Sequence, residues 1–146
     1  MNHMTYIEIG DWTQLQAEAQ AVRTAVFVHE QGIAPEDEWD AADATALHAV
    51  LMDAQGRPLG NARLSQPSPS LAKVGRMAVL REARGKGYGA RLLHALLVEA
   101  RRRGHKEVRL SAQRSAEGFY AAHGFSAVGE PFDEVGIPHI EMRLVF

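Results

Sequence analysis

The sequence predicts an α/β fold in a single domain that covers residues 1–146. Segments with the period of a strand and segments with the period of a helix follow one another along the whole chain. Their order is β-α-loop-β-β-β-α-β-α-β-β. The length of 146 residues and the hydrophobic content of 46% suit one domain with a core of its own.

The N-terminal part predicts one strand and one helix. Residues 5–9 alternate between apolar and polar side chains, and Gly10 ends that strand. Asp11 with Gln14 is the signature of a helix N-cap, so we expect a helix that runs to about Val28. Its apolar residues share one face: Leu15, Ala19, Val22 and Val26.

An acidic segment and two strands come next. Residues 29–43 are rich in acids, Pro and Gly without a clean period, which predicts an exposed, mobile loop with solvated acids and at most one helical turn. Strands are expected at residues 45–52 and 58–64, because the segment 53–57 between them has the residues of a hairpin turn. The run SQPSPS at 65–70 is expected to be a loop.

The stretch that organises the chain follows. It predicts an apolar strand at about 73–80, a glycine-rich turn at 84–90 and a long amphipathic helix that Gly104 ends as a C-cap. The helix presents one apolar face: Leu92, Leu93, Leu96, Leu97 and Ala100.

The C-terminal part predicts three more strands and a short helix. We expect a strand at 107–112, a helix at 115–122, and closing strands at 125–128 and 140–146. The segment 130–139 between the last two is expected to be a loop.

The turn RGKGYGA has the features of an anion site. Its glycines allow backbone conformations that a side chain would forbid, so that N–H groups can point inward. The unpaired amides and the dipole of the following helix face the same loop, and Arg84 and Lys86 add positive charge. The Walker pattern is absent, and the acid that a dinucleotide fold needs after the next strand is missing.

The same turn resembles the acetyl-coenzyme A (acetyl-CoA) signature R/Q-x-x-G-x-G/A of the GCN5-related N-acetyltransferase (GNAT) superfamily, matched by Arg84, Gly87 and Gly89. The resemblance continues through a strand, a short helix with Ala116 and Tyr120, and a closing strand pair. It implies a mixed, mostly antiparallel sheet of about seven strands with helices on both faces. It also implies that the strands ending near Val79 and Ala112 splay apart around the cofactor.

The resemblance implies where acetyl-CoA binds. The backbone of Met77, Ala78 and Val79 would bond the pantetheine amides. The pyrophosphate would lie on the turn formed by Arg84, Gly85, Lys86, Gly87, Tyr88, Gly89 and Ala90. Many family members carry Asn where this chain has Gln113, so one hydrogen bond to the cofactor is altered here.

Acetylating an amine requires a base for the ammonium proton and an acid for the departing thiolate. Tyr120 occupies the family's tyrosine position, and a phenol has the pKa to protonate a thiolate; the alternative is an aromatic that packs its helix on the sheet. His139 is the candidate base, because an imidazole titrates near neutral pH and the tail P-H-I-x-M resembles the branch that includes glyphosate N-acetyltransferase. Glu30 and the acids at 36–38 are rival bases, and the histidines show no convincing metal-ligand spacing.

Three arginines predict the class of acceptor. Arg23 and Arg76 lie in apolar surroundings where a guanidinium needs an anionic partner, and Arg114 leaves a strand beside the same gap. Their positions match the arginines with which that branch holds a small anionic amine, and Glu30 is expected beside it. The alternative is internal ion pairing, for which three acids are available: Glu30, Glu38 and Asp40.

Composition excludes several function classes. A net charge of −2 offers no excess of positive charge for nucleic acid, and the absence of cysteine excludes a cysteinyl intermediate. No apolar run approaches the roughly 18 residues of a membrane helix, and the N-terminus does not resemble a signal peptide. We therefore expect a cytoplasmic protein, a monomer or homodimer, that binds neither nucleic acid nor a membrane.

The resulting hypothesis is direct acetyl transfer from acetyl-CoA to a small, anionic primary or secondary amine, without a metal. Two other functions remain open. A non-catalytic acyl-CoA-binding regulatory domain would keep the glycine turn and lack turnover. A peptide or protein N-acetyltransferase would need an open groove rather than an arginine-lined pocket.

Overall fold

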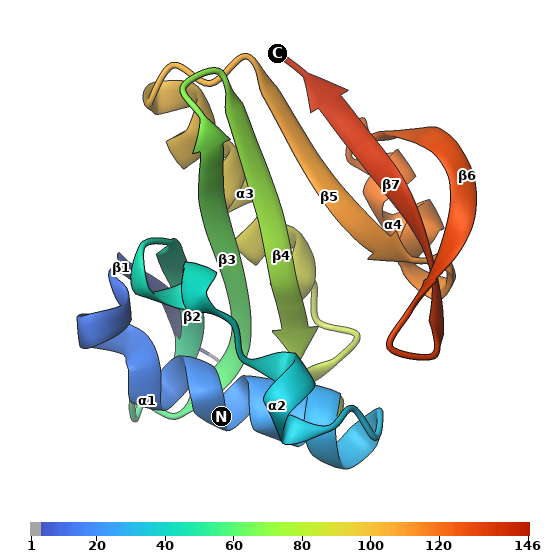
Figure 1. Cartoon of the computed structure of the whole chain (residues 1–146). Coiled ribbons are helices and arrows are strands. Elements are labelled where there is room, and N and C mark those ends of the chain that lie inside the picture. Colours follow the sequence, from blue (N-terminus) through green and yellow to red (C-terminus); the bar gives the residue numbers. More distant parts are fainter. Residues whose placement is uncertain (1–3) are drawn as a thin grey trace.

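The computed structural model describes residues 4–146. Their centre is one seven-stranded sheet in the order β1-β2-β3-β4-β5-β7-β6, in which only β4 and β5 are parallel (Figure 1). The strands are β1 (Thr5–Gly10), β2 (Leu47–Asp53), β3 (Pro58–Ser68), β4 (Leu71–Val79), β5 (Glu107–Gln113), β6 (Ser126–Glu134) and β7 (Ile137–Val145). The predicted mixed, mostly antiparallel sheet is confirmed.

Eight helical segments connect these strands within the described residues. The α-helices are α1 (Trp12–Arg23), α2 (Pro35–Glu38), α3 (Tyr88–Arg102) and α4 (Glu117–Ala122). The π-helix η1 (Thr24–Glu30) extends α1, and single 3₁₀ turns form η2 (Ala41–Ala44), η3 (Arg81–Ala83) and η4 (Arg114–Ala116).

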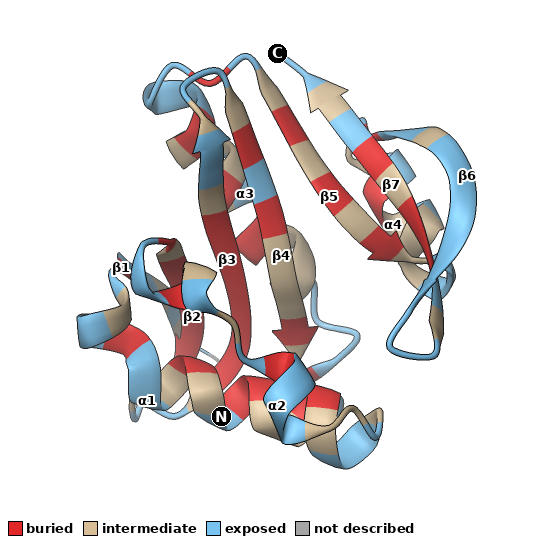
Figure 2. Ribbon diagram, viewed as in Figure 1, coloured by how far each residue is buried: buried red, intermediate tan, exposed pale blue. Residues whose placement is uncertain are grey.

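Helices cover both faces of the sheet, as predicted. Side chains alternate between faces along β2: Val50 packs with Leu15 of α1, whereas Leu51 packs in the large core with Leu92 of α3. Tyr120 of α4 belongs to that same large core, so α3 and α4 share one face and α1 covers the other (Figure 2).

The first helix begins as the sequence predicts and ends differently. The Asp11 side chain accepts from the amide of Gln14, and the Gln14 side chain accepts from the amide of Asp11, which completes a capping box. The predicted single helix to Val28 changes at Thr24 into a π-helix, so the turns after Arg23 are wider.

The splayed strand pair is present. β4 and β5 share register only over residues 71–73 and 107–109, and beyond Lys73 the edge of β4 that faces β5 has no strand partner among the described residues. Within β4, Arg76 has a φ of +53° where the register against β3 shifts, and its carbonyl accepts from Asn61 Nδ2 at 2.9 Å. This bulge bends β4 at the opening of the gap.

Three local predictions are wrong. Residues 29–43 do not form a solvated loop, because Glu38 and Asp43 are buried against arginines. The run 65–70 is mostly strand, since β3 continues to Ser68. The predicted loop 130–139 consists of the ends of β6 and β7, because Val135 and Gly136 turn the chain within two residues, both at positive φ.

Candidate active site

A cleft of about 500 Å³ occupies the gap between β4 and β5. The ends of both strands, the start of α3, α4, α2 and the turn between β6 and β7 all contribute to its wall. The predicted cofactor and catalytic residues on it are Met77, Ala78, Val79, Arg84, Gly89, Gln113, Tyr120 and His139. The topology therefore brings together residues that lie far apart in the sequence.

The glycine turn has the backbone geometry of an anion cradle. Gly85 and Gly87 have φ values of +80° and +79°, and a Cβ added at either would meet nothing within 4 Å. Gly87 is the N-cap of α3 and no side chain caps this helix; its first backbone bond runs from Arg91 N to Gly87 O. The amides of the first turn are thus free for an anionic ligand, and the residues present fit the pyrophosphate of acetyl-CoA.

Arg84 is held at the start of this turn. Its Nε donates to the carbonyl of Val79 at 3.0 Å, and its two terminal nitrogens each donate to a carboxylate oxygen of Glu30 at 2.7 Å. Hydrogen bonding by Arg84 lowers the pKa of Glu30. Glu30 does not itself line the cleft and is engaged by Arg84, so its predicted places beside the acceptor and as a rival base stay predictions.

Gln113 contacts the opposite side of the cleft opening. Its side-chain amide exchanges hydrogen bonds with that of Gln31, with nitrogen-to-oxygen distances of 3.0 and 3.4 Å. Both glutamines line the cleft. The end of η1 therefore contacts both sides of the gap, since its last residue Glu30 bonds Arg84 and the next residue, Gln31, bonds Gln113.

Tyr120 projects from α4 toward the cleft. It is 7% exposed and packs edge-on against Phe119 and Phe125, with ring centroids 5.1 and 6.0 Å away. Its hydroxyl has no hydrogen-bond partner among residues 4–146, and burial raises its pKa to about 12. The phenol is therefore protonated at neutral pH and has a proton to give.

His139 lies near the start of β7 and is 5% exposed. Nδ1 lies 2.7 Å from the carbonyl of Ile137, which only accepts, so Nδ1 carries the hydrogen and the neutral ring keeps its lone pair on Nε2. Nε2 lies 3.5 Å from a carboxylate oxygen of Glu134, and Phe132 stacks on the ring. The arrangement gives the lining of the cleft an oriented base beside a carboxylate.

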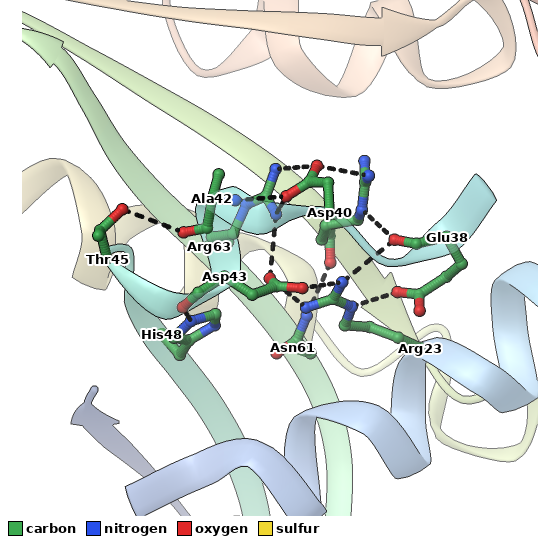
Figure 3. A network of polar contacts seen from close by, with 10 residues as sticks. Arg23, Glu38, Asp40, Ala42, Asp43, Thr45, His48, Asn61 and Arg63 are labelled. Atoms are coloured by element: carbon green, nitrogen blue, oxygen red, sulfur yellow. Dashed lines mark hydrogen bonds and ion pairs between the residues drawn. The ribbon is translucent and has the colours of Figure 1, made fainter. Parts of the chain in front are cut away.

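Arg23 is not available to an acceptor, contrary to expectation. Its guanidinium is 0% exposed, bonds the Glu38 carboxylate, and donates to both oxygens of Asp43 at 2.8 and 3.0 Å (Figure 3). Arg63 of β3 binds the same Asp43 and also Asp40. Arg23 therefore anchors the segment after η1 to α1, and Arg63 anchors it to β3. The internal ion pairing kept as an alternative is what the structure contains.

The other two arginines, Arg76 and Arg114, differ in their position relative to the cleft. Arg76 lines the cleft, donates from Nε to the Glu38 carbonyl at 3.0 Å, and pairs with Asp40 at 3.0 Å. Arg114 is absent from the lining and pairs with Glu117 on the surface, so its contact with the acceptor stays a prediction. Of the three predicted arginines, only Arg76 lines the cleft.

The charges of this network set the protonation of its acids. Burial opposes ionisation of Asp43, but hydrogen bonds from Arg23 and Arg63 outweigh it and hold the pKa of Asp43 below its ordinary value. The pKa of Asp40 is lowered in the same way, against its partial burial, by Arg63 and Arg76. Burial lowers the pKa of His48, which bonds the Asp43 carbonyl through Nε2.

Sequence reasoning missed several residues of the site. Gln31, Arg63 and Glu134 all line the cleft. Only Glu134 has a sequence signal, because it lies five residues before His139 across a turn containing Gly136. The contacts of Gln31 and Arg63 depend on tertiary packing between segments far apart in the sequence, which no local pattern encodes.

Two further observations concern residues 4–146 as a whole. No group of three or more metal-ligating side chains among them is arranged to hold a metal ion. None of their helices has the length and apolarity needed to cross a membrane.

Comparison with known proteins finds a matching family, a similar curated protein and similar crystal structures. A model of the acetyltransferase (GNAT) domain matches residues 13–146. The curated Bacillus subtilis protein YjcF, described as an uncharacterized N-acetyltransferase, is 34% identical over 83% of this chain and 86% of its own. Two crystal structures are also similar. An acyl-CoA N-acyltransferase from Pseudomonas aeruginosa is 31% identical (TM-score 0.86, 97% of this chain and 100% of that one), and Escherichia coli ElaA is 27% identical (TM-score 0.86, 97% and 99%).

Proposed function

Because the chain belongs to the acetyltransferase (GNAT) family and is an acetyl-CoA-dependent N-acetyltransferase, we propose that it acetylates an amine directly, with Tyr120 as the acid and His139 as the base. The observation that carries this proposal is that both side chains line the cleft between β4 and β5. A regulatory domain without turnover would have no need of an oriented imidazole and a protonated phenol at the same cleft.

The chain offers acetyl-CoA two sets of backbone groups. The free amides at the start of α3 fit the pyrophosphate, and the unpaired edge of β4 at 77–79 fits the pantetheine amides. When bound, acetyl-CoA supplies the thioester from which the acetyl group leaves. A buried phenol near that thioester also limits the access of water.

His139 and Tyr120 have complementary roles in this proposal. Nε2 of His139 accepts the proton of the acceptor's ammonium group, and the Glu134 carboxylate 3.5 Å away stabilises the imidazolium that results. Tyr120 donates its hydroxyl proton to the departing thiolate. Its raised pKa ensures that the proton is present at neutral pH.

The acceptor is proposed to be a small amine that carries an anionic group. Within the cleft lining, Arg76 supports this class, although Asp40 already neutralises part of its charge. A peptide acceptor is the second candidate. This candidate is favoured by the face of the sheet opposite α3 and α4, where no helix covers β5 or β7 (Figure 1).

A panel of amines tests the proposal. Release of free coenzyme A thiol should depend on an added amine, and mass spectrometry should find the acetyl group on that amine. Tyr120→Phe and His139→Gln should both reduce this release. Acetyl-CoA binding without amine-dependent turnover would instead support the regulatory function.

A further inference from the structure

Three cations lie side by side across three neighbouring strands. Lys73 of β4 is in register with Arg109 of β5, and Arg109 is in register with Arg143 of β7. We call these three residues the cation row. Serines continue the same register on both sides, Ser65 of β3 beside Lys73 and Ser126 of β6 beside Arg143.

The whole row lies on one face of the sheet. Val74, Val108 and Met142, which neighbour the three cations along their strands, are buried in the core under α3 and α4. Because side chains alternate along a strand, the cations lie on the opposite face. Figures 1 and 2 show α1 and α2 on that face near the end of β4 that holds Arg76 and Ala78, whereas no helix lies over β5 or β7.

The row is poorly neutralised. Arg109 hydrogen-bonds Glu107, but neither Lys73 nor Arg143 forms an ion pair with any residue in 4–146. Like charges directly opposite each other destabilise a sheet. An anionic ligand bound to the cation row would offset this repulsion. The row is therefore suited to binding an anion.

The row is continuous with the active-site cleft. Lys73, Ser65 and Ser111 line the cleft, and His139 lies on the same face of β7 as Arg143. Four residues separate His139 from Arg143, as they separate Gln113 from Arg109. At a rise of about 3.3 Å per residue, the row is roughly 13 Å from the level of His139.

A carboxylate lies between the two levels. Glu141 is two residues from both His139 and Arg143, and its side chain accepts a hydrogen bond from Ser111 at 3.1 Å. An anion at this intermediate level would be repelled, whereas an anion at the level of the row would be attracted. This face of the sheet therefore favours an acceptor whose anionic group reaches the level of the cation row over one whose anionic group lies at the level of Glu141.

From these observations we infer that the acceptor is of the second proposed class, an extended, peptide-like amine whose anionic group binds Lys73, Arg109 and Arg143 about 13 Å from the reacting nitrogen. This inference rests on the proposed function, because it places that nitrogen at His139. It moves the anion site of the acceptor away from Arg23 and Arg114, which are engaged elsewhere.

Pentapeptide amides of alanine and serine with a free N-terminus are suitable probes, because each residue adds about 3.3 Å to the extended length. A single Glu at position 3 or position 5 is compared with Gln at the same position. We expect a Glu-over-Gln preference in kcat/KM of roughly fivefold at position 5, the usual strength of exposed ion pairs. At position 3, kcat/KM for the Glu peptide should equal or fall below that for the Gln peptide.

Variants assign the preference to the row. The double variant Lys73→Gln, Arg143→Gln should lose it, so that its kcat/KM is the same for the Glu and the Gln peptide at position 5. A salt concentration of 0.5 M should weaken the preference of the wild type, since a Debye length of about 4 Å screens exposed charges. Arg102→Gln is the matched control, because it removes an exposed charge on α3 that pairs with Glu99.

The outcomes that would contradict the inference differ from the one that would contradict the proposed function. A Glu preference that is equal at both positions, or that survives in the double variant, overturns the inference. So does a failure of every pentapeptide while small amines are acetylated. Absence of amine-dependent turnover with any acceptor would instead contradict the proposed function itself.

Discussion

Arg84, the first residue of the glycine turn, and Glu30, the last residue of η1, are joined by two parallel hydrogen bonds of 2.7 Å. The pair links the start of the glycine turn to the end of η1, beside the cleft. It also places a negative charge next to the turn that is proposed to receive the pyrophosphate.

Replacing Glu30 by Gln should tighten the binding of acetyl-CoA by a few-fold, because Arg84 keeps its charge and loses its neutralising partner. The value of kcat should stay within about threefold of the wild type, well short of the roughly 10²-fold loss expected if a general base were removed. Calorimetry gives the first quantity and thiol release the second. Glu8→Gln on β1 is the control, and a collapse of kcat in Glu30→Gln would restore Glu30 as the base.

Replacing Tyr120 by Phe should lower kcat by roughly 10²-fold, because the phenol that is proposed to protonate the thiolate is lost while the ring still fills the core. The dissociation constant of acetyl-CoA should hardly change. Tyr6→Phe removes a hydroxyl on β1 and should leave kcat unaltered. Equal kcat in wild type and Tyr120→Phe would mean that the residue only packs α4.

Replacing His139 by Gln should remove the acidic limb of the profile of kcat against pH, because kcat reports groups within the enzyme–substrate complex. An imidazole base works only when neutral, so activity through it rises with pH and is lost as pH falls. His94→Gln, on the exposed side of α3, should keep the limb. If the limb survives in His139→Gln, another group is the base, and Asp37 on the cleft wall is the next candidate.

Replacing Gly87 by Val should abolish acetyl-CoA binding. A Val strains a backbone with φ of +79°, and its side chain would project into open space where the anion is proposed to bind. Gly104→Val is a matched control, since that glycine has φ of +87°, also faces open space and caps the other end of α3. Both variants should lose similar stability, and only Gly104→Val should bind acetyl-CoA.

Replacing Asp43 by Asn should lower the free energy of unfolding by about 3–5 kcal/mol, because it leaves the buried Arg23 without its main partner. The sign of the pH dependence follows from the lowered pKa values of Asp40 and Asp43. Their stabilisation is present above the unfolded value of about 3.9 and is lost as pH falls through the folded value. Denaturant titrations below pH 4 should therefore show a steep loss for the wild type and a shallower one for Asp43→Asn.

Local patterns predicted the parts of the fold that depend on neighbouring residues. The capping box of Asp11 and Gln14 needs four residues of sequence, and the positive φ values of Gly85 and Gly87 follow from the glycine turn itself. The extension of β6 and β7 through residues 130–139 was missed because every residue of β6 except Val128 is exposed, which removes the alternation that marks a strand.

The acceptor side of the cleft could not be predicted in the same way. Arg23 was recognised as a cation that needs an anion, but its partners lie 15 and 20 residues away in the segment after η1. Which anion a buried arginine takes is decided by how that segment docks on β3 and β4. The cation row was missed for a related reason, since its members become neighbours only through strand register.

The most direct test of the account is a stopped assay in which wild-type protein, acetyl-CoA and an amine panel are followed by thiol release and by mass spectrometry of the amine. Direct transfer predicts one acetylated amine for each thiol released, with both signals falling together in Tyr120→Phe and His139→Gln. Thiol release without an acetylated amine, or tight binding of acetyl-CoA without release in any mixture, would contradict it.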